Sequence, residues 1–255
     1  MTMNEYRDRI INFGKETGAQ IVLPEMMDVR VSEASRELIS MDFNILNIEY
    51  FQDRLDIYLD FLNKLPFTDN WPTDNLRDFL NDPLHFAMAM VACDDADCLV
   101  AGAVNSSSEV IRSAIRMIGI RPTSDQVSSI FFMISPDGNT AFTFADCAVI
   151  PEPNSKQLAA IGAESAEFHH FLSSEEPLVA FLSFSTKGSA SHYRVDRVRD
   201  AVEIFGNKYP QIIHDGEVQF DAAIIPEVNK LKILNSPING QANVLIFPNL
   251  DAGNI

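Results

Sequence analysis

The sequence predicts an α/β fold in which helices cover mostly parallel sheets, divided over two domains. Short β-rich runs alternate along the chain with segments of helical periodicity, which is the pattern of α/β proteins. Several runs, such as Leu178–Phe184 and the stretch NVLIF at 243–247, are apolar at both odd and even positions, as in strands buried on both faces. The 255 residues leave room for one large domain or two of ordinary size.

Seven runs have the composition of strands. They are Gln20–Glu25, Cys98–Asn105, Ser128–Ser135, Ala141–Val149, Leu178–Phe184, Glu217–Ile224 and Ala242–Pro248. In such a fold we expect ligands at the carboxyl ends of the strands.

Helices are expected between these runs. Tyr6–Glu16 and Ser191–Phe205 place apolar residues on one face, and Asn154–Phe171 follows a Pro-Glu-Pro stop with Asn154 or Ser155 as its N-cap. The acidic, aromatic-rich segment Asn44–Asp82 is interpreted as helices around turns at Pro66 and Pro72.

A domain boundary is expected at the connector Gly119–Asp125, which has the residues of a turn. This gives an N-terminal α/β domain of residues 1–122 and a second α/β domain of residues 123–255.

The sequence ends soon after an apolar strand, with no covering helix expected behind it. We therefore expect the C-terminal segment of the second domain to be missing.

Composition narrows the class of protein. The apolar share of 46% and the charged share of 22% are those of a soluble globular chain. A net charge of −17 with no basic run argues against nucleic acid and anionic membranes as partners. No segment approaches the roughly 20 apolar residues of a membrane helix, and the start lacks the features of a signal peptide. Three scattered cysteines indicate reduced thiols in a cytoplasmic protein, and no zinc pattern is present, so we expect no metal.

The first candidate site lies where the run ending at Asn105 meets a helix. Ser106, Ser107 and Ser108 stand at the expected helix start, where hydroxyls and unpaired N–H groups attract anions. Arg112, one turn further on, has a guanidinium that grips phosphate with two hydrogen bonds. The alternative is that the serines only cap the helix.

The second candidate site is the loop Ser183–Ala190. Ser185, Thr186, Lys187 and Ser189 surround a glycine after an apolar strand, which is the chemistry of a phosphate-binding loop without a Walker A motif. The alternative is an ordinary loop with a solvated Lys187.

Two further groups are weaker candidates. Asp146 follows a strand and is expected either to orient a substrate group or to hold a neighbouring loop. Cys147 has no histidine at a nucleophile's usual spacing. The cluster His214–Asp221 has enough carboxylates for a divalent metal, although carboxylates that pair with nearby groups are the more common outcome.

The residues at these sites resemble the phosphate acetyl/butyryl transferase family. The matching stretches are IVLPE at 21–25 with Asp28 and Arg30, DCLVAGAVNSSSEVIR at 97–112, FADC at 144–147, LSFSTKGSA at 182–190, DGEVQFDAAIIPEV at 215–228 and SPINGQANVLIFPNLDAGNI at 236–255. The last three are highly specific together. The resemblance covers nearly all the chain and is weakest between Ile45 and Asp82.

The resemblance implies two α/β domains flanking a cleft, as in isocitrate and isopropylmalate dehydrogenases, and commonly a homodimer. It implies the activity of a phosphate acetyltransferase, which moves an acetyl group reversibly between coenzyme A and inorganic phosphate without metal or cofactor, coenzyme A being a substrate. A coenzyme A thiolate attacks acetyl phosphate directly in a ternary complex. Ser106–Ser108 and Arg112 then correspond to the phosphate locus, Ser185, Thr186, Lys187 and Ser189 to the opposite wall of the cleft, and Asp146 to a supporting residue.

Departures from the family pattern leave alternatives open. Relatives carry a Ser-Arg-Gly-Cys segment and an Asp beyond the point where this sequence ends, so the catalytic residues stay unknown. The nearest equivalent of a second substrate arginine is Lys64, and the loop Ser135–Thr140 is shorter than in relatives. The alternatives are a non-catalytic module that binds acyl-CoA or acetyl phosphate, and a truncated inactive homologue. The sequence does not set the acyl chain length.

Overall fold

The computed structural model describes residues 3–122, 124 and 126–255. Residue contacts divide the chain into two compact units, Ile10–Arg121 and Met1–Arg9 together with Pro122–Ile255, here called the N-terminal and C-terminal units. Each unit is described by itself. The connector expected as a boundary, 119–125, includes Thr123 and Asp125, which lie outside the described residues, and the division into domains of residues 1–122 and 123–255 stays a prediction.

A small parallel sheet lies in the N-terminal unit. Its strands β1 (Gln20–Val22), β2 (Asn44–Leu46) and β3 (Cys98–Leu99) have the order β2-β1-β3. The two runs expected here, Gln20–Glu25 and Cys98–Asn105, both end early as strands. The cause is Glu25, whose carboxylate accepts the backbone N–H groups of residues 102–105, which therefore bond to a side chain instead of a neighbouring strand.

Helices make up most of the N-terminal unit. They are α1 (Met3–Thr17), of which the first residues belong to the C-terminal unit, α2 (Val29–Ser40), η1 (Ile48–Arg54), α3 (Leu55–Leu62), η2 (Pro66–Thr68), α4 (Thr73–Leu80), α5 (Pro83–Ala92) and α6 (Ser107–Met117). Caps set several starts: Asp28, Asp82 and Ser106 each accept a backbone N–H of the first turn. The helices and the two turns expected between Asn44 and Asp82 are confirmed, whereas β2 was not predicted.

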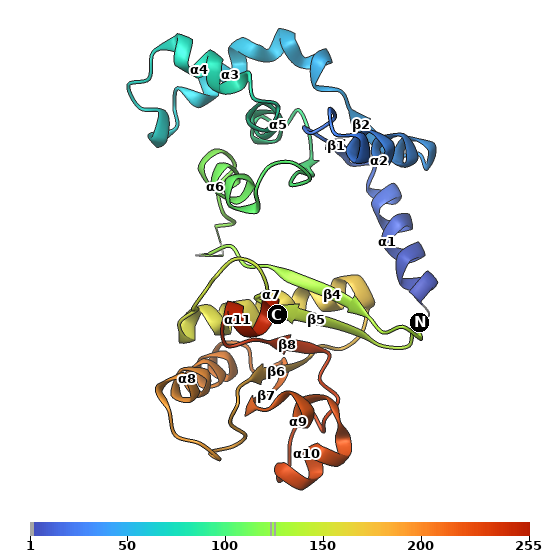
Figure 1. The fold of residues 1–255 in the computed structure, drawn as a ribbon, viewed down its shortest axis with the longest axis vertical. Coiled ribbons are helices and arrows are strands. Elements are labelled where there is room, and N and C mark those ends of the chain that lie inside the picture. The colour runs from blue at the N-terminus through green and yellow to red at the C-terminus, as the bar shows by residue number, and fades with distance from the viewer. Residues whose placement is uncertain (1–2, 123, 125) are drawn as a thin grey trace. The chain divides into compact units, whose positions relative to one another are not determined.

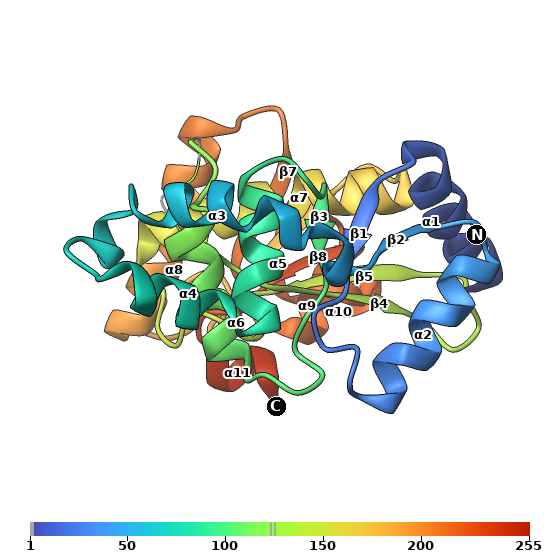
Figure 2. The same ribbon diagram turned by 90° about the horizontal axis from the view of Figure 1, so that it is seen from above.

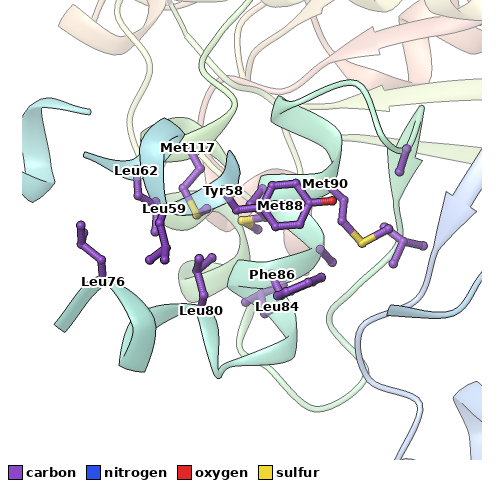
Figure 3. Close-up of a cluster of buried hydrophobic side chains, with 14 residues drawn as sticks. Tyr58, Leu59, Leu62, Leu76, Leu80, Leu84, Phe86, Met88, Met90 and Met117 are labelled. Atoms are coloured by element: carbon purple, nitrogen blue, oxygen red, sulfur yellow. The ribbon is translucent and has the colours of Figure 1, made fainter. Parts of the chain in front are cut away.

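The core of the N-terminal unit is helical. Side chains of α3, α4, α5 and α6 meet in one buried cluster (Figure 3). It includes Tyr58, Leu59, Leu62, Leu76, Leu80, Leu84, Phe86, Met88, Met90 and Met117. Helices α5 and α6 pack side by side in both views of the fold (Figures 1 and 2), so the residues of α6 are held on a rigid element.

The C-terminal unit is built on a sheet of five strands in the order β4-β5-β8-β6-β7 (Figure 1). The strands are β4 (Ile130–Ile134), β5 (Ala141–Ala145), β6 (Leu178–Leu182), β7 (Ile213–Val218) and β8 (Val244–Ile246). Only the pair β4–β5 is antiparallel among the ladders described. Because β5, β8, β6 and β7 run parallel, their carboxyl ends lie at one edge of the sheet.

Helices cover this sheet on both faces. Helices α7 (Ser155–Ser173) and α8 (Tyr193–Lys208) pack on one face, where Val179 and Phe181 of β6 are buried with them. The neighbouring residues Ala180 and Leu182 are buried on the other face, in a cluster with α9 (Phe220–Ile224) and residues that flank α10 (Pro226–Lys232). The two-sided burial expected for this strand is confirmed.

One expectation about the C-terminal unit is wrong. The run expected as a strand at Glu217–Ile224 is divided between two elements: β7 (Ile213–Val218) ends at Val218, and α9 begins at Phe220, with the neighbouring residues Ala222 and Ala223 both buried as in a helix. A short helix, α11 (Leu250–Asn254), follows the last strand; it is capped by Asn249, which accepts the N–H of Ala252, and none of its residues is buried. Within the described residues, no helix combines the length and apolar character needed to cross a bilayer.

Candidate functional site

The loop Ser183–Ala190 follows β6 at the carboxyl edge of the sheet and closes around a buried carboxylate. Glu217, at the end of neighbouring β7, accepts the Ser185 hydroxyl at 3.0 Å and the Gly188 N–H at 2.8 Å. The Arg199 guanidinium of α8 holds both oxygens of this carboxylate, with contacts of 3.0 and 3.1 Å. The donors expected to bind an anion thus bind one that the chain itself supplies.

Electrostatics show that Glu217 is charged. Burial by itself raises the pKa of this carboxyl group, but hydrogen bonds from Arg199, from backbone N–H groups and from Ser185 outweigh burial, so the pKa lies below its ordinary value. The same contact raises the pKa of Arg199. The pair is therefore ionised throughout the physiological range.

Lys187 is also engaged within the chain. Its ammonium forms an ion pair with the buried carboxylate of Asp215 and donates to the carbonyl oxygen of Gly216 at 2.7 Å. Gly188 has a φ of 89°, which a glycine adopts without strain and which lets the loop fold back on Glu217. Lys187 thus brings little unneutralised charge to a ligand.

Exposure separates the four predicted residues of this loop. Ser185 and Thr186 are buried, and Thr186 exchanges hydrogen bonds with Gln219. Lys187 and Ser189 are exposed, and the Ser189 hydroxyl accepts the N–H of Thr186 at 3.0 Å. The two buried residues shape the loop, which leaves Lys187 and Ser189 as the groups able to reach a ligand. Substrate binding by these four residues stays a prediction.

A second buried carboxylate lies in the N-terminal unit, at Glu25. Its two oxygens accept the backbone N–H groups of Gly102, Ala103, Val104 and Asn105, between 2.7 and 3.1 Å. Burial raises the pKa of this carboxyl group, yet the four N–H donors outweigh burial and leave the pKa below its ordinary value. Glu25 therefore fixes the loop that leads into α6.

The start of α6 follows directly. Ser106 is the N-cap and accepts the N–H of Glu109 at 3.3 Å, and substrate binding by this serine stays a prediction. Ser107 and Ser108 are exposed on the first turn, and the exposed Arg112 lies one turn behind Ser108. The structure thus brings Ser107, Ser108 and Arg112 together on one helix, and their role toward a substrate stays a prediction.

Asp146 holds its own loop. Its carboxylate accepts the N–H groups of Ala148, Val149 and Ile150, at 2.7 to 3.2 Å, together with the hydroxyl of Ser129. These are the contacts of a loop-holding residue, the second of the two roles expected for it. Its neighbour Cys147 is buried, and burial raises the pKa of its thiol to about 11, which suppresses the thiolate.

The acidic cluster around β7 is divided among cations. Asp215 pairs with Lys187, Glu217 with Arg199, and Asp221 with Lys232 at 2.7 Å. Among the residues that the structure describes, no group of three histidine, cysteine or carboxylate side chains is arranged for a metal ion. The carboxylates serve as ion-pair partners.

The sequence and the fold are similar to those of known proteins, and these similarities identify the family. The family model described as phosphate acetyl/butaryl transferase matches residues 40–255, which is most of the chain and includes both serine loops. The chain belongs to this family. The similarity therefore extends over both units.

Individual relatives agree with the assignment. A phosphate acetyltransferase of Thermoanaerobacterium thermosaccharolyticum is 39% identical over 96% of this chain and 83% of its own length, and one of Acetivibrio thermocellus is 33% identical over 98% and 83%. Among solved structures, the EutD phosphotransacetylase from Staphylococcus aureus matches with a TM-score of 0.86 and 31% identity, over 100% of this chain and 84% of that one. A phosphotransacetylase from Streptococcus pyogenes matches with a TM-score of 0.87 and 29% identity, over 100% and 84%.

Sequence reasoning missed Glu25, Arg199 and Glu217 as the groups that organise the two loops. Glu25 follows β1, whose parallel neighbour β3 leads into the loop at 100–106, so pairing of the two strands would have placed the carboxylate beside that loop. Arg199 gave no such signal, because it lies among polar residues of an amphipathic helix.

Proposed function

We propose that this protein is a phosphate acetyltransferase, an acyltransferase that moves an acetyl group reversibly between coenzyme A and inorganic phosphate. The observation that carries the proposal is the similarity to phosphate acetyltransferases over 96% and 98% of the chain. The matching region includes both serine loops, the features that independently indicated an anion.

The reaction requires a base, a thiolate nucleophile and donors that stabilise developing charge. The coenzyme A thiol loses its proton to a base, and the thiolate attacks the carbonyl carbon of acetyl phosphate. A carbon–sulfur bond forms, the bond between that carbon and the bridging phosphate oxygen breaks, and phosphate leaves with the electron pair. Donors that stabilise the carbonyl oxygen and the departing phosphate as charge develops supply most of the acceleration.

We propose that the substrate donors in the N-terminal unit are Ser107, Ser108 and Arg112. The hydroxyls and N–H groups of Ser107 and Ser108 face outward at the start of a helix of 11 residues, whose dipole favours an anion there. Arg112 adds a charged fork. Ser106 supports them as the cap.

In the C-terminal unit we propose that Lys187 and Ser189 contact substrate, while Ser185 and Thr186 hold the loop in shape. This division follows from exposure and from the hydrogen bonds of Ser185 with Glu217 and of Thr186 with Gln219. Asp146 supports the adjoining loop without touching the substrate.

The same proposal includes the domain arrangement, the oligomeric state, the cellular location and the cofactor requirement. We infer a domain arrangement like that of isocitrate and isopropylmalate dehydrogenases, a homodimer, a cytoplasmic location, and coenzyme A as substrate with no added cofactor. Sedimentation of the purified protein tests the dimer, which predicts twice the mass of the chain.

The experiment that tests the activity follows acetyl-CoA formed from acetyl phosphate and coenzyme A by the full-length gene product. Phosphate-dependent turnover in the reverse direction supports the proposal. Binding of coenzyme A without any turnover in a folded protein overturns it in favour of a binding module.

A further inference from the structure

The start of α1 is attached to the C-terminal unit by a small number of side chains. The chain passes between the two units within this helix, after Arg9, and again after Arg121. Among the side chains of α1 that the structure describes, only Tyr6 is fully buried. An element with so few buried contacts opens locally at a low free-energy cost. The contacts of Tyr6 and Arg9 therefore determine how firmly the start of α1 is held.

Tyr6 is bound to the residues around the end of α7. Its hydroxyl donates to Glu175 Oε1 at 2.5 Å, and its ring packs edge-to-face on Phe132 of β4, with ring centres 6.0 Å apart. Burial and the hydrogen bond to Glu175 raise the pKa of Tyr6 to about 12, so the hydroxyl keeps its proton and remains a donor. Of the other charges on α1, Glu5 raises this pKa and Arg9 lowers it.

Arg9 binds the end of α7 directly. Its guanidinium donates to the carbonyl oxygens of Phe171 and Ser173, at 3.4 and 3.2 Å, and to the hydroxyl of Ser174. The last carbonyl groups of a helix lack partners within the helix and carry partial negative charge, which favours a cation there. The contacts of Tyr6 and Arg9 are here called the α1 clasp.

A buried histidine lies behind Glu175. His169 of α7 is fully buried, and its Nε2 lies 3.6 Å from Glu175 Oε2, which is too far for a hydrogen bond. Within the described residues, this nitrogen has no hydrogen-bond partner, whereas Nδ1 lies 3.0 Å from the Thr143 hydroxyl of β5. The Phe132 ring is in contact with both His169 and Tyr6. Removal of Tyr6 therefore uncovers this cluster and lets water reach the imidazole.

The charges around the imidazole oppose its protonation while it is buried. Burial lowers the pKa of His169 below its ordinary value, attraction to Glu175 offsets burial only in part, and His170 adds to the lowering. From α1, Tyr6 is neutral while it donates to Glu175, and Arg9 is bound to the end of α7. The strands β4 and β5 present the uncharged side chains of Phe132 and Thr143.

Acid favours the open form of the clasp. A hydrated imidazole has a pKa near 6.5, and the pKa of the buried ring lies lower. Above about pH 6.5 the ring is neutral whether the clasp is open or closed, so the closed form has its full stability. As the pH falls below about 6.5, the open form takes up a proton first and gains population. This shift ends below the pKa of the buried ring.

We propose that the α1 clasp is a pH-sensitive switch, in which Tyr6 and Arg9 hold the start of α1 on the C-terminal unit at neutral pH and uptake of a proton by His169 releases it. After release, the chain itself joins the two units only through the crossing after Arg121. No substrate takes part in this step, so the switch is independent of the proposed function.

Backbone hydrogen exchange of the full chain tests the switch, with rates corrected for the intrinsic effect of pH. Between pH 7.5 and pH 5.5 we expect α1 to lose up to about tenfold of its protection, because a hydrated imidazole at pH 5.5 is protonated about ten times more often than it is neutral. Protection of β6 is expected to stay unchanged. An equal loss in α1 and β6 reports destabilisation of the whole unit and overturns the switch.

Two variants test the contacts of the clasp at pH 7.5. Tyr6→Phe keeps the ring and removes the donor, and we expect exchange in α1 to become about tenfold faster, as for loss of one charge-assisted hydrogen bond. Arg9→Gln is expected to act in the same direction. Arg36→Gln is the matched control, since Arg36 is a helical arginine that donates to the carbonyl oxygen of Ser32 in its own helix. Wild-type exchange of α1 in both Tyr6→Phe and Arg9→Gln overturns the clasp.

His169→Gln tests the sensor. Glutamine takes up no proton in this range, so we expect protection of α1 to be the same at pH 7.5 and pH 5.5, whereas His192→Gln, at an exposed histidine, keeps the wild-type response. A nuclear magnetic resonance titration of the wild-type imidazole gives a second readout, and its pKa is expected to rise toward 6.5 in Tyr6→Phe. A pH response that persists in His169→Gln, or an equal pKa of His169 in the wild type and Tyr6→Phe, overturns the switch.

Discussion

At the level of single residues, the serine loops are organised by carboxylates from elsewhere in the chain. Small hydroxyl residues, glycine and a cation indicate a ligand anion at Ser183–Ala190, which stays a prediction, whereas the anion that accepts the Ser185 hydroxyl in the structure is Glu217, 32 residues away. The residues near Ser185 in the sequence do not indicate Glu217 as a partner, because the pairing of β6 with β7 brings Glu217 beside this loop. The exposed candidates Arg112 and Ser189 could be named from sequence, whereas Arg199 could not.

Removing the charge of Glu217 tests its structural role. We expect Glu217→Gln to lower the free energy of unfolding by about 2 to 3 kcal/mol, because the Glu217 carboxylate is buried and its charge-assisted hydrogen bonds with Arg199, Ser185 and Gly188 are lost or weakened. Denaturant unfolding measures the change. Glu152→Gln is the control, because Glu152 pairs with Arg197 but its own side chain is 54% exposed. We expect this variant to lower the free energy of unfolding by less than about 1 kcal/mol. Equal effects of the two variants contradict the account.

The pH dependence of stability has a defined sign. The folded-state pKa of Glu25 lies below the ordinary value of 4.5, because four N–H donors outweigh burial. The unfolded chain therefore binds protons first as the pH falls, so the stabilisation is complete above about pH 4.5 and is lost as the pH falls through the folded-state pKa. We expect the free energy of unfolding, measured from pH 7 to pH 3, to fall less steeply with pH for Glu25→Gln than for the wild-type protein. Parallel curves would show that Glu25 contributes nothing to this dependence.

At the level of elements, prediction succeeded where caps and two-sided burial fix the local structure. Helix α7 begins after Asn154, whose side chain forms a capping box with Gln157. Strand β6 is buried at both odd and even positions, as expected. Strand β2 was missed because its three residues are held by pairing with β1. Apolar residues of α9 were assigned to a strand because a five-residue run has too few turns to show helical periodicity.

Helix α7 packs closely on the sheet at Gly162. A Cβ at this position would lie 2.8 Å from Phe181 Cζ and 3.1 Å from Phe205 Cε2. Glycine to alanine in a helix normally stabilises by about 1 kcal/mol, but here we expect Gly162→Ala to destabilise by about 1 to 3 kcal/mol through overpacking. Thermal unfolding measures the sign, and Phe181→Leu in the same chain is expected to restore part of the loss. A more stable Gly162→Ala variant would contradict this packing.

At the level of the whole molecule, the coarse fold and the family were accessible from sequence, while the division of the candidate site residues into buried and exposed ones was not. The mixed α/β class follows from alternating elements, and the family follows from motifs such as LSFSTKGSA at 182–190 together with the match over residues 40–255. Which hydroxyls face a ligand depends on side-chain burial, which separates Ser185 from Ser189 within one loop. Residue type alone does not make that distinction.

The central claim is acetyl transfer between coenzyme A and phosphate with Arg112 as a substrate-binding residue. The most direct measurement is the rate of acetyl-CoA formation from acetyl phosphate by the full-length gene product, wild type and Arg112→Ala, with Arg36→Gln as control. We expect turnover in the wild type and the control, and a loss of about 100-fold in Arg112→Ala, typical for removal of one charge-stabilising donor. No acetyl-CoA from folded wild-type protein, or equal rates for wild type and Arg112→Ala, would contradict the claim.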